Sequence, residues 1–224
     1  MKHGFVKVAA ITPDMRVADV VYNTEEICRR MEEAVEAGAK VLVFPELAIT
    51  GYTCGDLFFQ DALLNSAEEG LRTIIESSKG KDALVFVGLP FSHAGKLYNV
   101  AAAVNDGELL GLTTKTFLPN YDEYYEMRYF QPGPTTTEQI EFDGKKVAFG
   151  PQILFECREM KELVVAAEVC EDVWAPVSPS VPAAIQGATI LANCSASDES
   201  LGKETYRREL IKGQSVKLIA GYVY

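Results

Sequence analysis

The sequence lacks the marks of a disulfide-stabilised, zinc-binding or nucleic-acid-binding protein. Its five cysteines are odd in number, widely scattered and without a Cys-x-x-Cys pair, which argues against a disulfide framework and a structural zinc site. Lysine and arginine together number 21 against 32 acidic residues, so the net charge is −11. A chain this acidic is a poor candidate for binding nucleic acid or an anionic membrane through its overall charge. We expect no metal ion.

Long apolar runs are also absent. Residues 1–16 contain no apolar core of the kind found in signal peptides, and no run reaches the length of a transmembrane helix. There is no internal repeat, low-complexity segment or interdomain linker. With 48% hydrophobic residues the chain can bury one large core, so residues 1–224 are expected to form one domain. The missing signal and the unpaired cysteines predict a reducing, cytoplasmic location.

Short apolar segments separated by turn residues predict an α/β fold with inserted hairpins. A strand, a helix and a second strand follow one another at the start, as in a βαβ unit. Asn23 and Glu26 have the spacing of a capping box for that helix, and Gly38 stands where it should end. Pro90 is expected to end the third strand. The predicted strands are 5–11, 40–44, 83–87, 98–104, 108–113, 140–142, 146–149, 163–167, 189–193 and 218–224, and the predicted helices are about 23–38, 56–79, 182–186 and 203–217.

A cysteine lies just after the apolar strand 163–167, which reads as a strand buried on both faces. Cys170 stands among the carboxylates of Glu168, Glu171 and Asp172. Carboxylates raise the pKa of a thiol, so a reactive thiolate here needs a cation from another part of the chain. The alternative is that Cys170 is one more small buried hydrophobic residue.

Two further polar residues follow strands. Glu46 lies at the carboxyl end of the strand 40–44, where open α/β sheets place their ligand sites, although alone it equally suits a helix N-cap or a solvated loop. Lys115 follows the strand 108–113, and alone it suits an exposed surface position. Together with Cys170 they offer a complete chemistry. Lys115 can lower the thiol pKa, Glu46 can act as general base, and the lysine and the backbone N–H after the cysteine can hold an oxyanion.

An aromatic segment follows Lys115. Residues 117–129 hold five aromatic side chains interleaved with charged ones, which is too polar for core and too aromatic for a free linker. The pattern favours a binding loop packed against the site, with an oligomer contact as the alternative.

The order Glu46, Lys115, Cys170 on an α/β sheet resembles the nitrilase, or carbon–nitrogen hydrolase, superfamily. Four blocks in order resemble one branch of it, the glutaminase domains of glutamine-dependent NAD synthetases. These blocks are PELAITGYTCGDLF, KTFLPNYDEYYEMRYF, EVCEDVWAP and NCSASDESLGK with the later YRRELI and AGYVY. The resemblance runs along essentially the whole chain, with spacings of 115 − 46 = 69 and 170 − 115 = 55 residues.

The resemblance implies an αββα four-layer sandwich and a role for each matched residue. Glu46 is expected to be the general base, Lys115 the oxyanion stabiliser and Cys170 the nucleophile. Glu126 is expected to be the structuring carboxylate, with Glu123 close enough to compete. The positions that match the family's glutamine-binding residues are Tyr121, Glu171, Ser197 and Lys203. A glutamine ammonium needs a carboxylate, and its carboxylate needs a cation or a hydroxyl.

The resemblance also implies partners. Hydrolysis of glutamine through a cysteine thioester needs no cofactor, and the released ammonia is used by an ATP-dependent synthetase domain. ATP, Mg²⁺ and the NAD precursor belong to that domain, whose Ser-Gly-Gly phosphate-binding loop has no counterpart here. The chain also ends before the last elements expected of the glutaminase domain, so we expect a truncation and a homo-oligomer. The alternatives are a stand-alone amidase for another small amide, and a catalytically silent assembly fragment with residues 121–130 as its contact surface.

Overall fold

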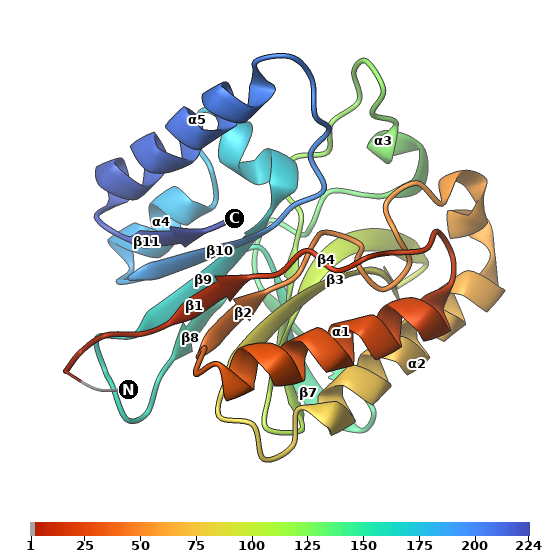
Figure 1. Cartoon of the computed structure of the whole chain (residues 1–224). Helices are drawn as coiled ribbons and strands as arrows, with labels where there is room; N and C mark the ends of the chain where they lie inside the picture. Colours follow the sequence, from red (N-terminus) through yellow and green to blue (C-terminus); the bar gives the residue numbers. More distant parts are fainter. Residues whose placement is uncertain (1–2) are drawn as a thin grey trace.

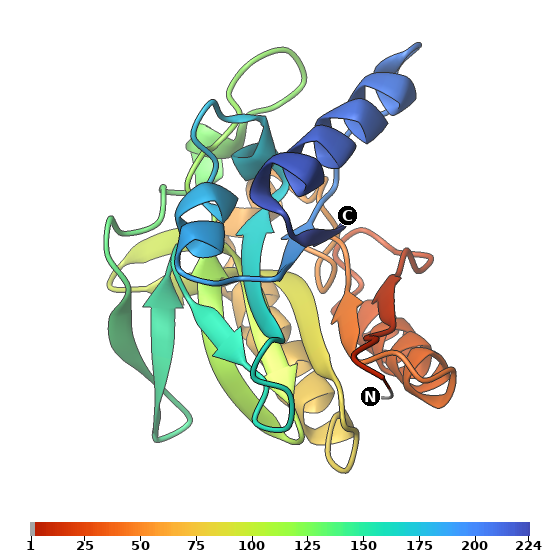
Figure 2. The ribbon, with the colours of Figure 1, turned by 90° about the vertical axis from the view of Figure 1, so that its left-hand side faces the viewer.

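The computed structural model describes residues 3–224. Two β-sheets pack face to face, and helices cover the outer face of each (Figure 1). The predicted αββα four-layer sandwich is confirmed. Figure 2, turned by 90°, shows helix α5 crossing above the smaller sheet on the side away from α1 and α2.

The larger sheet has seven strands in the order β1-β2-β3-β4-β5-β7-β6. β1, β2 and β3 are parallel, β3 to β5 form an antiparallel meander, and β7 pairs parallel with β5 and antiparallel with β6. The strand bounds are Val8–Ala10 (β1), Val41–Val43 (β2), Leu84–His93 (β3), Lys96–Asn105 (β4), Glu108–Thr114 (β5), Glu138–Phe142 (β6) and Lys145–Gly150 (β7).

The smaller sheet has four strands in the order β11-β10-β9-β8. The first three are mutually parallel, and β8 is antiparallel to β9. Their bounds are Leu154–Glu156 (β8), Val164–Val169 (β9), Ile190–Cys194 (β10) and Gly221–Val223 (β11).

Within residues 3–224, five α-helices and two 3₁₀ helices connect the strands. α1 and α2 cover the larger sheet, whereas α4 packs on the smaller one and α5 leads into β11 (Figure 1). The helix bounds are Val20–Glu36 (α1), Asp61–Ser77 (α2), Glu126–Tyr129 (α3), Ser180–Ile185 (α4) and Lys203–Leu218 (α5), with 3₁₀ helices at Gly55–Phe59 and Cys170–Trp174. No helix in residues 3–224 is both long enough and apolar enough to span a bilayer.

Alternation along the buried strands sends side chains into different layers. On β9, Val165 and Ala167 face the other sheet, whereas Ala166 faces α4. Glu168 falls on the α4 side by the same period of two, and its carboxylate accepts a hydrogen bond from the N–H of Ser180 at 2.8 Å. Cys170 is two positions further on, but β9 ends at Val169 and the left-handed backbone of Cys170 breaks the alternation, so Cys170 lies in the core between the sheets and Glu168 does not.

Four local predictions were wrong. α1 begins at Val20 with Asp19 as its N-cap, and Asn23 lies inside the helix, where its amide donates to the carbonyl groups of Arg16 and Ile49. β3 continues through Pro90 to His93. β2 is short and pairs only with residues 84–86 of β3, so at Pro90 no strand on that side needs a hydrogen bond from the proline nitrogen.

The last strand is shorter than predicted. Leu218 closes α5, Ile219 adopts the left-handed conformation that ends the helix, and only Gly221–Val223 joins the sheet. The long helix predicted over residues 56–79 is likewise divided, into a 3₁₀ turn and α2.

Candidate active site

The three predicted catalytic residues lie in one buried cluster at the ends of three strands. Glu46 follows β2, Lys115 follows β5 and Cys170 follows β9. Their exposed fractions are 1%, 1% and 5%. The surface positions considered for Glu46 and Lys115 from the sequence are therefore wrong, because both side chains are enclosed between the two sheets.

Lys115 lies between two carboxylates. Its Nζ donates to Oε1 of Glu46 and to Oε1 of Glu126, each at 2.6 Å, and the hydroxyl of Tyr52 donates to the same Glu126 oxygen at 2.7 Å. Burial alone lowers the pKa of the lysine, but Glu46, Cys170 and Glu126 raise the pKa overall, so Lys115 stays charged. Glu123 is exposed, so Glu126 is the carboxylate that contacts the lysine.

Glu46 is fixed by contacts from both sheets. Its Oε1 accepts a hydrogen bond from the side-chain amide of Asn99 at 2.7 Å, and its Oε2 accepts one from the backbone N–H of Ala196 at 3.2 Å. Asn99 is on β4 of the larger sheet, and Ala196 follows β10 of the smaller one. The carboxylate therefore has three partners, which are the side chains of Asn99 and Lys115 and the backbone N–H of Ala196. A substrate proton is a fourth.

The backbone that carries Glu46 passes unusually close to β3. A Cβ atom placed on Gly88 meets the backbone N of Leu47 at 2.3 Å and the carbonyl oxygen of Pro45 at 2.6 Å. Backbone atoms cannot yield as the end of a flexible side chain can, so only glycine allows this approach. Leu47 itself has a φ of 51°, which shows that the turn after Glu46 is tightly constrained.

Gly88→Ala is therefore expected to push Glu46 out of the cluster. We expect a loss of roughly 1–3 kcal/mol or more in the free energy of unfolding, as for other overpacked sites, together with loss of activity. Gly213→Ala is the matched control, because a Cβ there meets nothing within 4 Å. Urea unfolding of the two variants measures the effect. Equal stability and activity of both variants would contradict the close approach.

Cys170 occupies the bend between β9 and a 3₁₀ helix. Its φ of 45° lies in the left-handed region of backbone conformation, which residues other than glycine rarely adopt. Asp172 stabilises the bend, because its carboxylate accepts hydrogen bonds from the N–H groups of Val169, Thr116 and Phe117 at 2.9–3.0 Å. This buried carboxylate therefore connects the nucleophile's turn to the segment that follows Lys115.

The surroundings of Cys170 favour the protonated thiol over the thiolate. Burial raises the pKa of Cys170 well above its ordinary value, the negative charge of Glu46 raises it further, and Lys115 opposes both. Lys115 lowers the thiol pKa, as expected from the sequence, but burial and Glu46 outweigh it. A nucleophilic Cys170 needs a base at the moment of attack, and Glu46 is the carboxylate positioned to be that base.

Glu126 gives the cluster a pH-dependent stability. Burial and the charge of Glu46 raise the pKa of Glu126 from 4.5 to about 7, although Lys115 opposes them. The folded protein therefore binds this proton more tightly than the unfolded chain does. The stabilisation is complete below pH 4.5 and is lost as the pH rises through about 7.

We expect Glu126→Gln, which mimics the protonated acid, to remove that pH dependence. Between about pH 4.5 and 7 the wild type should lose up to roughly 3 kcal/mol of unfolding free energy relative to the variant. Urea unfolding of both proteins across this range gives the difference. Parallel stability curves would show that Glu126 titrates as it does in the unfolded chain.

The four predicted substrate-binding residues form two groups. The hydroxyl of Tyr121 donates to both oxygens of Glu171, at 2.9 and 3.0 Å. Burial raises the pKa of Glu171, and the Tyr121 hydrogen bond and the charges of Lys115 and Lys203 oppose the rise. Lys203 forms an ion pair with Asp198, and its Nζ lies 5.7 Å from the centre of the Trp174 ring. The aromatic segment therefore does pack against the site, as the sequence predicted.

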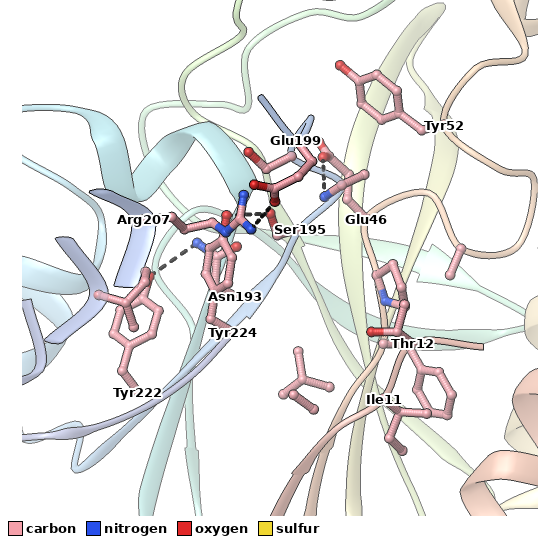
Figure 3. A pocket seen from close by; sticks show the side chains of 18 of the residues that line it. Ile11, Thr12, Glu46, Tyr52, Asn193, Ser195, Glu199, Arg207, Tyr222 and Tyr224 are labelled. Carbon is pink, nitrogen blue, oxygen red and sulfur yellow. Dashed lines mark hydrogen bonds and ion pairs between the residues drawn. The ribbon is translucent and has the colours of Figure 1, made fainter. Parts of the chain in front are cut away.

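Ser197 lies on the wall of a large cleft that opens beside the cluster. This cleft has a volume of about 1180 Å³ and runs between β1 and β2 on one side and β10, β11 and α5 on the other. Figure 3 shows Glu46 and Ser195 at its inner end and Tyr222, Tyr224 and Arg207 along one wall. Glu46 lines the cleft, whereas Cys170, Glu171 and Tyr121 do not.

Several residues that hold the cluster were not found from the sequence. Asn99 and Asn193 each interrupt an apolar strand, and a buried amide within such a strand is a signal that could have been used. Tyr52 and Asp198 lie in loops, and nothing in their local pattern indicates their partners. Asp172 was recognised as an acidic neighbour of Cys170 but not as the acceptor of three backbone N–H groups.

Comparison with known families agrees with this geometry. Residues 7–213 match the family described as carbon–nitrogen hydrolase. The chain belongs to this family. The prediction of a carbon–nitrogen hydrolase enzyme is therefore confirmed.

Individual relatives place the chain within the family. It is 37% identical over 223 residues to a glutamine-dependent NAD(+) synthetase of Mycobacterium tuberculosis, and the aligned region covers all of this chain and 33% of the relative. The crystal structure of a glutamine-dependent NAD(+) synthetase from Cytophaga hutchinsonii has a TM-score of 0.86 and 32% identity, covering 97% of this chain and 35% of that one. An amidase from Nesterenkonia sp. shares the fold, with a TM-score of 0.74, 20% identity and coverage of 100% and 77%. The chain thus spans about a third of the length of the synthetases it matches.

Proposed function

We propose that this chain is a glutamine amidohydrolase domain that cleaves the side-chain amide through a γ-glutamyl thioester on Cys170. The observation that supports the proposal most strongly is the buried cluster in which Lys115 joins Glu46 and Glu126 beside Cys170. The similarity to glutamine-dependent NAD synthetases supports glutamine as the amide.

In the first half of the reaction, Glu46 takes the proton of Cys170 as the sulfur attacks the amide carbon. The ammonium of Lys115 and the backbone N–H of Glu171 stabilise the resulting oxyanion. Glu171 suits this role because it lies in the first turn of its 3₁₀ helix, where N–H groups have no acceptor within the helix. Glu46 then returns the proton to the leaving nitrogen, and ammonia departs as the carbonyl re-forms on the thioester.

In the second half, water replaces ammonia. Glu46 removes a proton from the water as it attacks the thioester carbon, and the carbon–sulfur bond breaks to release glutamate and restore the thiol. The proton that Glu46 holds passes to the sulfur. Both halves use only side chains and backbone groups of this chain with water, so the proposed hydrolysis requires no cofactor.

Recognition of glutamine is assigned to the residues around the thiol. The carboxylate of Glu171, already oriented by Tyr121, binds the substrate ammonium, while Lys203 and Ser197 bind its carboxylate. Asp198 pairs with Lys203 and accepts from the hydroxyl of Tyr124, so it keeps the lysine at this edge of the site.

Glu171→Gln is the test of this assignment. Losing a charge-assisted hydrogen bond should raise KM for glutamine roughly tenfold to a hundredfold, while iodoacetamide still labels Cys170. Steady-state ammonia release measures KM, and Glu141→Gln, an exposed carboxylate on β6, is the control. An unchanged KM would mean that Glu171 is only a loop carboxylate.

A panel of amides separates the proposal from its alternatives. Glutamine should be preferred over simple aliphatic amides, because these lack both charges that Glu171 and Lys203 recognise. Preference for simple amides would instead indicate a stand-alone amidase. A Cys170 that resists alkylation, with no amide hydrolysed, would indicate a silent assembly fragment.

The proposed partner of the reaction is an ATP-dependent synthetase domain that uses the ammonia, with ATP, Mg²⁺ and the NAD precursor bound there. The organisation of residues 1–224 as one domain belongs to the same proposal. β11 is an edge strand of the smaller sheet, which leaves a row of backbone groups available to another strand. A homo-oligomer remains a prediction that light scattering tests. A cytoplasmic location also remains a prediction.

A further inference from the structure

Cys170 depends on its surroundings for its conformation. A left-handed φ at a residue other than glycine persists only where neighbouring groups hold it. The β9–β10 ladder does not supply that support, because its last pair is Val169 with Cys194. The peptide groups of Cys170 therefore lie just past the end of the sheet.

The side chain of Asn193 takes the place of the missing strand neighbour. Its Oδ1 accepts a hydrogen bond from the N–H of Cys170 at 2.8 Å, and its Nδ2 donates to the carbonyl oxygen of Cys170 at 3.4 Å. One amide thus contacts both polar backbone groups of the nucleophile. Asn193 is only 1% exposed, so water does not compete with these contacts.

A chain of buried polar groups determines which way this amide points. The Cys170 N–H can only donate, so it must face Oδ1 of Asn193. Nδ2 donates to the hydroxyl of Tyr222 at 3.1 Å, and that hydroxyl donates in turn to the carboxylate of Glu168. Glu168 is itself held by the N–H of Ser180 at 2.8 Å. Figure 3 shows the contact between Asn193 and Tyr222 on the wall of the cleft.

Two of these groups have no place in the proposed reaction. Glu168 is 1% exposed and lies on the α4 side of β9, and Tyr222 comes from the edge strand β11. A buried carboxylate and a partly buried tyrosine hydroxyl are costly unless they pair with each other or with a third group. Here they meet at the amide of Asn193.

We propose that Asn193 is a positioning residue for the nucleophile, and that Tyr222 and Glu168 fix the orientation of its amide. This inference rests on the proposed function, in which Cys170 attacks an amide. The Cys170 peptide sets both the direction of Sγ and the position of the following Glu171 N–H. Losing the support should therefore slow the chemical step without weakening glutamine binding, because none of the three side chains is assigned to the substrate.

Tyr222→Phe tests the proposal, because it removes one hydroxyl and keeps the ring. We expect kcat for glutamine hydrolysis to fall roughly tenfold, with KM within about twofold of the wild type. Rates are normalised to the folded fraction from urea unfolding, so a loss of stability alone does not count. Tyr98→Phe is the matched control, since Tyr98 is a buried tyrosine on β4 whose ring packs against Phe149.

The rate of alkylation of Cys170 by iodoacetamide is the second measurement, read by peptide mass spectrometry. The rate for Tyr222→Phe should differ at least about threefold from that for Tyr98→Phe, because the thiol is no longer held in one position. A kcat equal to the control, or a KM that rises in parallel as kcat falls, would overturn the proposal. If the wild type releases no ammonia from glutamine, the proposed function fails. The alkylation rates then decide: a difference supports the positioning role and equality overturns it.

Discussion

Replacing Lys115 with alanine is expected to lower kcat for glutamine hydrolysis by roughly 10²–10³-fold, the usual effect of removing one oxyanion donor. Lys115 is the only cation that contacts Glu46 within residues 3–224, and its charge opposes the rise in the pKa of Cys170. Its loss therefore affects the thiol, the general base and the oxyanion together. Steady-state ammonia release measures the effect.

Stability must be separated from catalysis in this variant. Removing one partner of a buried ion pair typically costs about 3–5 kcal/mol, and here two carboxylates lose their cation. The double variant Lys115→Met with Glu126→Gln keeps the volume and removes one buried charge, so it should fold better and remain equally inactive. Lys145→Ala is the control, because Lys145 forms only an exposed ion pair with Glu108. Activity of Lys115→Ala within a few-fold of this control would contradict the assigned role.

Replacing Cys170 with alanine is expected to abolish hydrolysis altogether, because no other group in the cluster can form the thioester. Glutamine binding should persist, since the ammonium and carboxylate of the substrate are assigned to Glu171 and Lys203. Ammonia release measures the first effect and calorimetric titration with glutamine the second. The structural reading of Cys170, as one more buried hydrophobic residue, predicts instead a small loss of stability with full activity.

The other cysteines provide the comparison for this variant. All five are free, and Cys157 lies partly exposed after β8, away from the cluster. Cys157→Ala should leave the rate unchanged. Residual hydrolysis by Cys170→Ala above the background of a protein-free sample would exclude a covalent mechanism on this residue.

The strands and the order of the three central residues could be predicted from the sequence for a physical reason. Residues 163–167 are apolar because β9 is buried between a sheet and a helix layer, and such a strand can end only where polar groups begin. Glu46, Lys115 and Cys170 each stand at such an end. Glu46 and Lys115 lie at the same end of the larger sheet because β2 is parallel to β3 and the β3–β5 meander returns β5 to that direction.

Contacts between distant segments could not be predicted in this way. Asn23 and Glu26 have the spacing of a capping box, but the side-chain amide of Asn23 instead donates a hydrogen bond to the carbonyl oxygen of Ile49, 26 positions away. Asn99 likewise gives no local sign that its amide meets Glu46, 53 positions earlier. The rise that burial causes in the pKa of Cys170 could not be predicted either, because burial depends on the packing of both sheets.

The central claim is that Cys170 attacks the side-chain amide carbon of glutamine. Its most direct test uses a glutamine analogue in which a chloromethyl ketone replaces the side-chain amide, so that attack leaves a stable bond to the sulfur. We predict complete inactivation with one analogue bound per chain, mapped by mass spectrometry to Cys170 and prevented by excess glutamine. Inactivation that modifies a different cysteine, or an unmodified Cys170 after prolonged exposure to the analogue, would contradict the claim.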